Sequence, residues 1–354
     1  MSFSAVTSPD SGARIDRLQD SAVLGETDLA LIEALQVRPR APWTRIAPAL
    51  GLDATTAARR WHRLTDNGLA WLTAYPAPPV STVGYVDVSC RPDALENLTE
   101  RLRTWPCVFS IDRTTGEHQL VLSVVAPNLP ALDAFLSEGL ARLDGVRSVR
   151  LGIGTRFYRE GSDWLVRALD QQQRSALVDN PARGSPSRPA QLRESDRALL
   201  LALSADARRS CADLAQDSGL SETTVRRRLS RMIRNRELYF RCDLAQRLAG
   251  WHVIATYRMD APADRLSEVG QFMAALPETR LCAAVTGECN LLLSAWLRSS
   301  TECASLEERL LRRFPELDVT ERNVTLHTVK RMGRLLNTDG VTVGHVPIGF
   351  RQSE

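Results

Sequence analysis

Three short segments between residues 195 and 236 carry apolar residues with the spacing of amphipathic helices. Ser195 is a suitable N-cap for the first, and four apolar residues then share one helix face: Ala198, Leu199, Ala202 and Leu203. A second helix is expected over 211–217. Ser218-Gly219-Leu220 predicts a tight turn, and Ser221 is placed to cap a third helix over 222–234. Two short helices, a glycine turn and a third helix form the helix-turn-helix pattern.

Residues 82–159 follow a different pattern, in which strands alternate with helices. Strands are expected over 83–88, 108–113, 119–125 and 146–157, and helices over 95–102 and 129–143. The same order returns later, with strands at 251–259, 279–285, 290–297 and 319–329 and helices near 264–275 and 301–314. The order strand, helix, strand, strand, helix, strand is typical of a ferredoxin-like fold.

Both patterns occur twice because the chain contains an internal repeat. A shift of 168 residues aligns 24–67 with 192–235 without a gap, and 17 of these 44 positions are identical. A shift of 171 aligns TTGEHQLVLS (114–123) with VTGECNLLLS (285–294). We therefore expect an α+β protein in which two winged-helix-like helix-turn-helix domains, A (21–75) and A′ (191–245), alternate with two ferredoxin-like domains, B (80–160) and B′ (249–334).

Three segments outside these units complete the expected plan. Residues 1–20 are predicted to form a flexible N-terminal tail, and 335–354 a C-terminal tail. Between the halves, 161–190 is predicted to hold a short helix capped by Ser162 and then a flexible joint, because NPARGSPSRPA (180–190) is rich in Pro, Gly and Ser.

Composition is that of an ordinary globular protein, with 44% hydrophobic and 25% charged residues. The apolar runs are far shorter than the ~18 residues that span a bilayer, and the N-terminus lacks the apolar core of a signal peptide. We therefore expect a cytoplasmic protein with no membrane contact, and the two helix-turn-helix units make association with the nucleoid the expected location within the cell. The seven cysteines show no CxxC spacing and the five histidines are scattered, so we expect reduced thiols, no metal site and no cofactor.

The net charge is only +3, but the charged residues are unevenly distributed along the chain. The segment 221–236 has six arginines and one acidic residue, whereas its counterpart 53–68 has three arginines and two acidic residues. The third helix of a helix-turn-helix enters the major groove, where arginine reads guanine and threonine contacts phosphate or a thymine methyl. A solvated helix face is the alternative, but such a face usually mixes both signs. The predicted DNA-contacting residues are Thr55, Thr56, Arg59, Arg60, Arg63, Ser221, Thr223, Thr224, Arg226, Arg227, Arg228 and Arg231.

At these residues the chain resembles the Lrp/AsnC (feast/famine) transcriptional regulators. The family's helix-turn-helix pattern is matched by Asp196, Leu214, Ala215, Gly219, Leu220, Ser221, Thr224, Val225, Arg227, Arg228 and Met232. The resemblance extends over most of the chain, and it implies that B and B′ bind a small-molecule effector and mediate oligomerisation.

The resemblance also indicates where an effector would bind, at the turn between the second and third strands. The family's turn reads T-G-x-Y-D. Here Thr-Gly is kept in both copies, while His118 and Cys289 replace the tyrosine, and Gln119 and Asn290 replace the aspartate. Loss of the aspartate weakens the case for a free amino acid over a related metabolite. The candidate neighbours are Thr115, Gly116, Glu117, His118, Thr286, Gly287, Glu288 and Cys289; alternatively, these residues only shape two hairpins.

The predicted function is sequence-specific binding of double-stranded DNA by a regulator with no catalytic residues. B and B′ would form an intramolecular pseudo-dimer that presents two unlike recognition helices to an imperfect palindrome, with half-sites ~34 Å apart. Replacing Arg227 or Arg228 by alanine should abolish specific binding, and replacing Arg59 should weaken it less. Further assembly into a homo-oligomer is expected. The alternatives are an effector-binding assembly protein without DNA binding, and a decarboxylase, because sirohaem decarboxylases resemble this family and some are tandem fusions.

Overall fold

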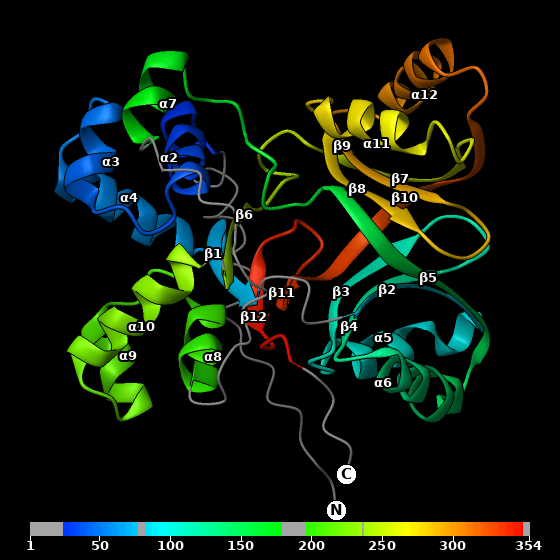
Figure 1. Cartoon of the computed structure of the whole chain (residues 1–354), viewed down its shortest axis with the longest axis horizontal. Coiled ribbons are helices and arrows are strands. Elements are labelled where there is room, and N and C mark those ends of the chain that lie inside the picture. Colours follow the sequence, from blue (N-terminus) through cyan, green and yellow to red (C-terminus); the bar gives the residue numbers. More distant parts are fainter. Residues whose placement is uncertain (1–23, 77–81, 179–195, 236, 350–354) are drawn as a thin grey trace, which may run out of the picture.

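The computed structural model describes residues 24–76, 82–178, 196–235 and 237–349. The helix-turn-helix units lie on one side of the molecule and the ferredoxin-like units on the other (Figure 1). In the described part of the chain, no helix is both long and apolar enough to cross a membrane.

Both helix-turn-helix units have the predicted three helices. A contains α2 (Glu26–Val37), α3 (Trp43–Ala49) and α4 (Ala54–Asp66), and A′ contains α8 (Arg197–Ala205), α9 (Cys211–Ser218) and α10 (Glu222–Arg234). Gly51 and Gly219 make the turns, each at φ +67°, a conformation that glycine adopts without strain. Ser221 caps the third helix of A′, as predicted, and Asp53 caps that of A; each accepts a hydrogen bond from a backbone N–H group. The other predicted cap, Ser195, lies outside the described residues.

A two-stranded ribbon joins the two helix-turn-helix units. It consists of β1 (Ala70–Pro76) and β6 (Leu238–Leu244), which pair antiparallel. Thr73 pairs with Arg241, and these positions are equivalent under the 168-residue shift, so a pseudo-two-fold axis passes through the centre of the ribbon. Arg40 donates to the carbonyl of Arg209 at 2.9 Å, and its counterpart Arg208 donates back to that of Pro39 at 2.8 Å. These reciprocal contacts fix A relative to A′.

Both ferredoxin-like units have the predicted order of elements. B contains β2 (Thr82–Cys90), α5 (Leu95–Arg103), β3 (Val108–Thr114), β4 (Leu120–Ala126), α6 (Leu129–Ala134) and β5 (Val146–Arg159). B′ contains β7 (Val253–Asp260), α11 (Leu266–Ala275), β8 (Thr279–Val285), β9 (Leu291–Leu297), α12 (Thr301–Arg313) and β10 (Asp318–Arg331). In each unit the strand order is second, third, first, fourth, as in a ferredoxin-like sheet.

The two sheets close on each other into an antiparallel eight-stranded ring. The order is β10-β3-β4-β2-β5-β8-β9-β7, and β7 pairs again with β10. At one junction Gly154 pairs with Val285, and at the other Thr114 pairs with Thr325. Because a shift of 171 residues converts one pairing into the other, the same pseudo-two-fold relation holds for B and B′. The sheets thus form the intramolecular pseudo-dimer that the repeat predicted.

The segment after β5 differs from its prediction. Ser162 does not cap a helix; the helix is α7 (Gln171–Leu177), and Asp170 caps it. Tertiary contacts hold the preceding residues in an irregular path, since Glu33 accepts hydrogen bonds from the backbone N–H groups of Ala168 and Leu169. The predicted flexible joint at 180–190 lies outside the described residues.

The predicted C-terminal tail is also wrong in part, because it contains two strands. β11 (Arg334–Leu336) and β12 (Thr342–His345) extend the sheet from the end of β10. The N–H of Thr342 donates to the carbonyl of Gly68 at 2.9 Å, which attaches this extension to A. The approach is so close that a Cβ on Gly68 would lie 2.4 Å from the Thr342 oxygen, so only glycine fits there.

Candidate nucleic-acid and effector sites

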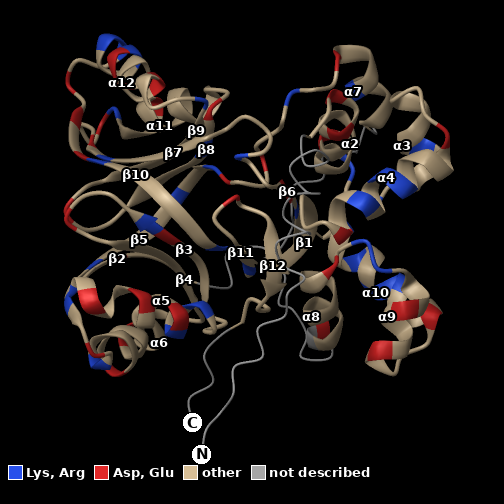
Figure 2. Cartoon of the chain, turned by 180° about the vertical axis from the view of Figure 1, so that it is seen from behind, with Lys and Arg blue, Asp and Glu red and all other residues tan. Residues whose placement is uncertain are grey.

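The outer face of α10 carries the exposed basic side chains of A′. Thr223, Arg226 and Arg227 are exposed near the start of the helix, on the side opposite its buried residues. Arg226 also pairs with Glu222 at 2.6 Å, one helical turn earlier. Figure 2 shows blue basic segments on both α10 and α4. Exposed arginine and threonine at the N-terminal part of the third helix are the groups that can reach base edges and phosphates.

Two predicted DNA-contacting arginines of A′ are held by a buried carboxylate. Asp196 is fully buried at the start of the first helix, and it accepts a hydrogen bond at 3.2 Å from Arg228 and a shorter one from Arg231. Arg231 also pairs with Glu237 at 3.2 Å. These contacts fasten α10 to the first helix of the unit. Arg228 and Arg231 therefore have a positioning role within A′, whatever contact they also make with DNA.

The first copy repeats this arrangement residue by residue. Asp28 is buried, and it pairs with Arg60 at 3.2 Å and with Arg63 at 2.5 Å. Thr56 is tied to the helix cap, because its hydroxyl donates to Asp53 at 2.6 Å. Thr55 and Arg59 remain exposed on α4. The exposed set in A is thus smaller than in A′, because Ala58 stands where A′ has Arg226.

The two turns that the family resemblance singled out lie at the junctions between B and B′. The hydroxyl of Thr115 accepts a hydrogen bond from the N–H of Val324 at 2.9 Å, and that of Thr286 accepts one from Ile153 at 3.0 Å. Gly116 and Gly287 both have positive φ, which explains why the turn keeps glycine. The turn threonines therefore bind each sheet to the other.

Other residues of these turns differ in exposure. His118 and Cys289 are buried, and Glu288 is exposed and pairs with Arg150 at 3.2 Å. Glu117 is exposed. His118, Cys289 and Glu288 lie beside a cluster of charged residues between B and B′.

That central cluster contains two pairs of opposite charge. Arg258 donates to one oxygen of Asp87 at 2.5 Å, and Arg150 donates to the other at 2.8 Å. Arg150 also forms a short hydrogen bond with Glu321. Asp87 and Arg258 are equivalent under the 171-residue shift, and so are Arg150 and Glu321. A symmetric pair of identical units would place like charges at these positions, so the complementarity depends on the divergence of the two copies.

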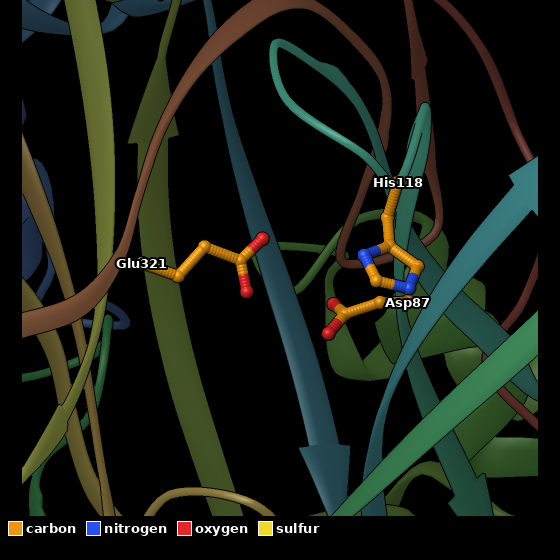
Figure 3. Close-up of side chains that lie close together, drawn as sticks. All are labelled: Asp87, His118 and Glu321. Atoms are coloured by element: carbon orange, nitrogen blue, oxygen red, sulfur yellow. The ribbon is translucent and has the colours of Figure 1, made fainter.

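Asp87, Glu321 and His118 also converge in a way that could suggest a metal site (Figure 3). Their donor atoms lie within 4.8 Å of one another. However, Arg150 and Arg258 already neutralise both carboxylates, so a divalent cation would meet two guanidinium groups. Burial opposes ionisation of Glu321, but the hydrogen bonds from Arg150 and Asn323 and the charges of Arg150 and Arg258 together outweigh it and lower the pKa of that carboxyl. The cluster is thus better described as an ion-pair network.

Comparison with known proteins agrees with both kinds of domain. The model of the Lrp/AsnC ligand binding domain matches residues 83–161 and 253–335, and that of the AsnC-type helix-turn-helix domain matches 24–65 and 194–233. An uncharacterised HTH-type transcriptional regulator of Pyrococcus abyssi is 31% identical over 151 residues, which cover 42% of this chain and 93% of that protein. The Bkd operon transcriptional regulator of Pseudomonas aeruginosa is 31% identical over 137 residues, covering 36% and 89% respectively.

A solved structure shares the architecture of the whole chain. The sirohaem decarboxylase NirDL superposes with a TM-score of 0.57, covering 87% of this chain and 93% of its own, at 14% sequence identity. At that identity the likeness concerns the fold alone. The matched domains, their order and their internal repeat show that this chain belongs to the Lrp/AsnC family of transcriptional regulators, as a tandem of two complete family units.

Proposed function

We propose that the chain binds an imperfect palindromic DNA site through A and A′, and that a small-molecule effector bound by B and B′ controls this binding. The observation that carries the proposal is the pseudo-two-fold ribbon of β1 and β6. It joins two helix-turn-helix units whose third helices present unequal sets of exposed basic residues. A pseudo-symmetric protein with two unequal recognition helices matches a pseudo-symmetric operator with two unequal half-sites.

Arg227, Arg226 and Thr223 are the residues of A′ that we propose to contact DNA most directly, with Thr55 and Arg59 as their counterparts in A. Thr56, Arg60, Arg63, Ser221, Thr224, Arg228 and Arg231 would support these contacts by holding the helices in place, since each takes part in a cap or an ion pair. The half-site read by A′ should therefore contribute more affinity and more sequence preference than the half-site read by A.

Selection of bound fragments from a random double-stranded DNA library tests the proposal with the full chain. It should enrich two related but unequal half-sites with centres about one helical turn apart, ~10 base pairs. The Arg227→Ala variant should lose preference in the stronger half-site, and Arg59→Ala in the weaker one. Arg101→Ala, on the distant helix α5, is the matched control and should leave the selected sequence unchanged. Failure of the wild type to enrich any sequence would contradict the proposal.

A second candidate function is sirohaem decarboxylation, which the likeness to NirDL over the whole chain favours. Absorption spectra recorded while sirohaem is added to the protein distinguish the two. Stoichiometric binding with a shifted visible band would support the enzyme, and an additive spectrum would support the regulator.

A further inference from the structure

A cavity lies between the inner faces of the two sheets, separate from the turns discussed above. Its volume is about 240 Å³. Tyr85 of β2 and Phe157 of β5 line it from B, and Leu281 of β8 and Trp296 of β9 line it from B′. Ligand pockets for drug-sized molecules hold about 300–1,000 Å³, so this cavity suits a small metabolite.

Basic side chains outnumber acidic ones among the residues that line this cavity. Arg241, Arg280, Lys330 and Arg331 face two carboxylates, those of Asp112 and Glu160. Burial raises the pKa of both carboxyl groups, and it lowers the pKa of Lys330 to about 8. A positive excess inside apolar walls is the setting in which a bound anion gains most, because the surroundings screen its charge weakly.

Arg280 is the most unusual of these basic residues. It is buried, and its guanidinium lies 4.3 Å from the centre of the Trp296 ring. Its Nη2 is taken by a short hydrogen bond to Asp243, which also accepts from Arg241 at 2.7 Å. Within the described part of the chain, Nε and Nη1 of Arg280 have no hydrogen-bond partner. Buried donors without partners are costly, and a bound acceptor would relieve that cost.

Because the two halves have diverged, the cavity has a buried arginine at this position in B′ only. Phe109 occupies the position equivalent to Arg280 under the 171-residue shift, and Glu160 occupies the position equivalent to Arg331. The basic end of the cavity is therefore formed on the B′ side, and the opposite side offers aromatic surface. A ligand would lie in one orientation, with its charged group toward Arg280.

We propose that this cavity binds one small carboxylate with an apolar or aromatic body and no ammonium group. Arg280 would receive the carboxylate, and Trp296 and Phe157 would cover the apolar part. Tyr75 and Arg241 also line the cavity and belong to the ribbon that joins A to A′. If the proposed function is correct, the ligand would thus contact the element that sets the spacing of the two recognition helices.

Titration calorimetry on the full chain tests the site, with quenching of tryptophan fluorescence as a second readout. The probes are phenylacetate and 4-methylpentanoate, compared with phenylacetamide and L-phenylalanine. At least one of the two acids should bind with a stoichiometry of one. The matched amide, which lacks the charge, should bind about tenfold to a hundredfold more weakly, the range typical of a lost hydrogen bond to a charged group. L-Phenylalanine should bind no better than the amide.

Two variants connect such binding to the cavity. Arg280→Gln should weaken it by about tenfold to a hundredfold. Ser294→Phe, which fills the cavity from β9 and leaves Arg280 in place, should abolish it. Arg101→Gln, outside the cavity, is the control, and thermal unfolding verifies that each variant is folded.

The site is refuted if neither acid binds at concentrations up to about 10 mM, because such an affinity would be too weak for a specific site. It is also refuted if the folded Ser294→Phe variant binds the acids as the wild type does. Preference for L-phenylalanine or for sirohaem over both acids would overturn the proposed ligand class. Regulation is measured separately, as the shift in DNA affinity with the ligand present. An unchanged DNA affinity with intact ligand binding contradicts the coupling to the ribbon and leaves the site standing.

Discussion

The buried pair Asp87–Arg258 offers the sharpest energetic test of the pseudo-dimer. The perturbation is a double-mutant cycle that uses Arg258→Met, Asp87→Leu and the double variant. Both side chains of the pair are almost fully buried: 6% of the Arg258 side chain and 1% of the Asp87 side chain are exposed. Removing one partner of a buried ion pair costs about 3–5 kcal/mol, because the remaining charge is left uncompensated.

The loss of unfolding free energy expected for each variant depends on the charges that remain near the replaced residue. In Arg258→Met, Asp87 keeps its contact with Arg150, so we expect a loss at the lower end, about 3 kcal/mol. For a unit of 150–250 residues this corresponds to a fall in Tm of about 6–12 °C. In the double variant Arg150 and Glu321 remain as a balanced pair, so most of the stability should return. The coupling energy should therefore be large and should favour the native pair.

Thermal unfolding followed by circular dichroism measures this cycle, with DNA absent. The exposed pair Arg312–Glu308, at 73% and 69% exposure, supplies the matched control cycle. Its coupling should be a few tenths of a kcal/mol, as for other exposed helix pairs. Additive effects of Asp87→Leu and Arg258→Met, with a double variant as unstable as the sum, would refute the claim that the two residues neutralise each other across the interface.

In Asp196→Asn, A′ should unfold at a temperature several degrees lower than in the wild type, because Arg228 and Arg231 lose their buried counter-charge, whereas the unfolding transition of B and B′ should not change. Unchanged thermal unfolding would show that these ion pairs do not stabilise A′. Burial, with help from Arg334 and Lys330, lowers the pKa of His345 to about 4, so the folded state resists a proton that the unfolded state accepts below about pH 6.5. The free energy of unfolding should therefore decrease as the pH falls from about 6.5 to 4. Urea titrations should show a smaller decrease for His345→Gln over that range, and an equal decrease in both proteins would contradict this. DNA affinity should fall steeply with salt, and Arg227→Ala should reduce the slope of log K against log salt by about one, whereas Arg101→Ala should leave the slope unchanged.

Much of the fold could be predicted because the periodicity of apolar residues and the internal repeat agree. The three helices of each helix-turn-helix unit and the strand order of B and B′ are confirmed. The repeat together with the family resemblance predicted a pseudo-dimer, and the pairing of Thr73 with Arg241 shows the pseudo-two-fold relation at atomic level. A local signal such as the cap Ser221 was sufficient because it acts within one helical turn.

The errors come from contacts between residues far apart in the sequence. Ser162 looked like a helix cap, but Glu33 of A holds residues 168 and 169 in an irregular conformation. The strand β12 was missed, although Val341, Thr342 and Val343 favour strand, because its attachment to Gly68 could not be seen locally.

The candidate sites show the same limit. The charge run on the third helix indicated a DNA-contacting face, but the ion pairs of Arg228 with Asp196 and of Arg60 with Asp28 appear only in three dimensions. One signal was available, because Asp28 and its two arginines recur 168 residues later as Asp196, Arg228 and Arg231. Repetition of an acid together with its basic partners indicates a structural contact as readily as a binding face. The cavity and Arg280 left no comparable pattern in the sequence.

The central claim is that one chain reads two unequal half-sites, and the most direct measurement is the affinity for three synthetic duplexes derived from the selected operator. One duplex keeps both half-sites as selected, the second duplicates the half-site assigned to A′, and the third duplicates the half-site assigned to A. The selected operator should bind most tightly, and Arg227→Ala and Arg59→Ala should each remove preference in one half-site only. Equal affinity for all three duplexes, or equal losses for both variants at both half-sites, would contradict it.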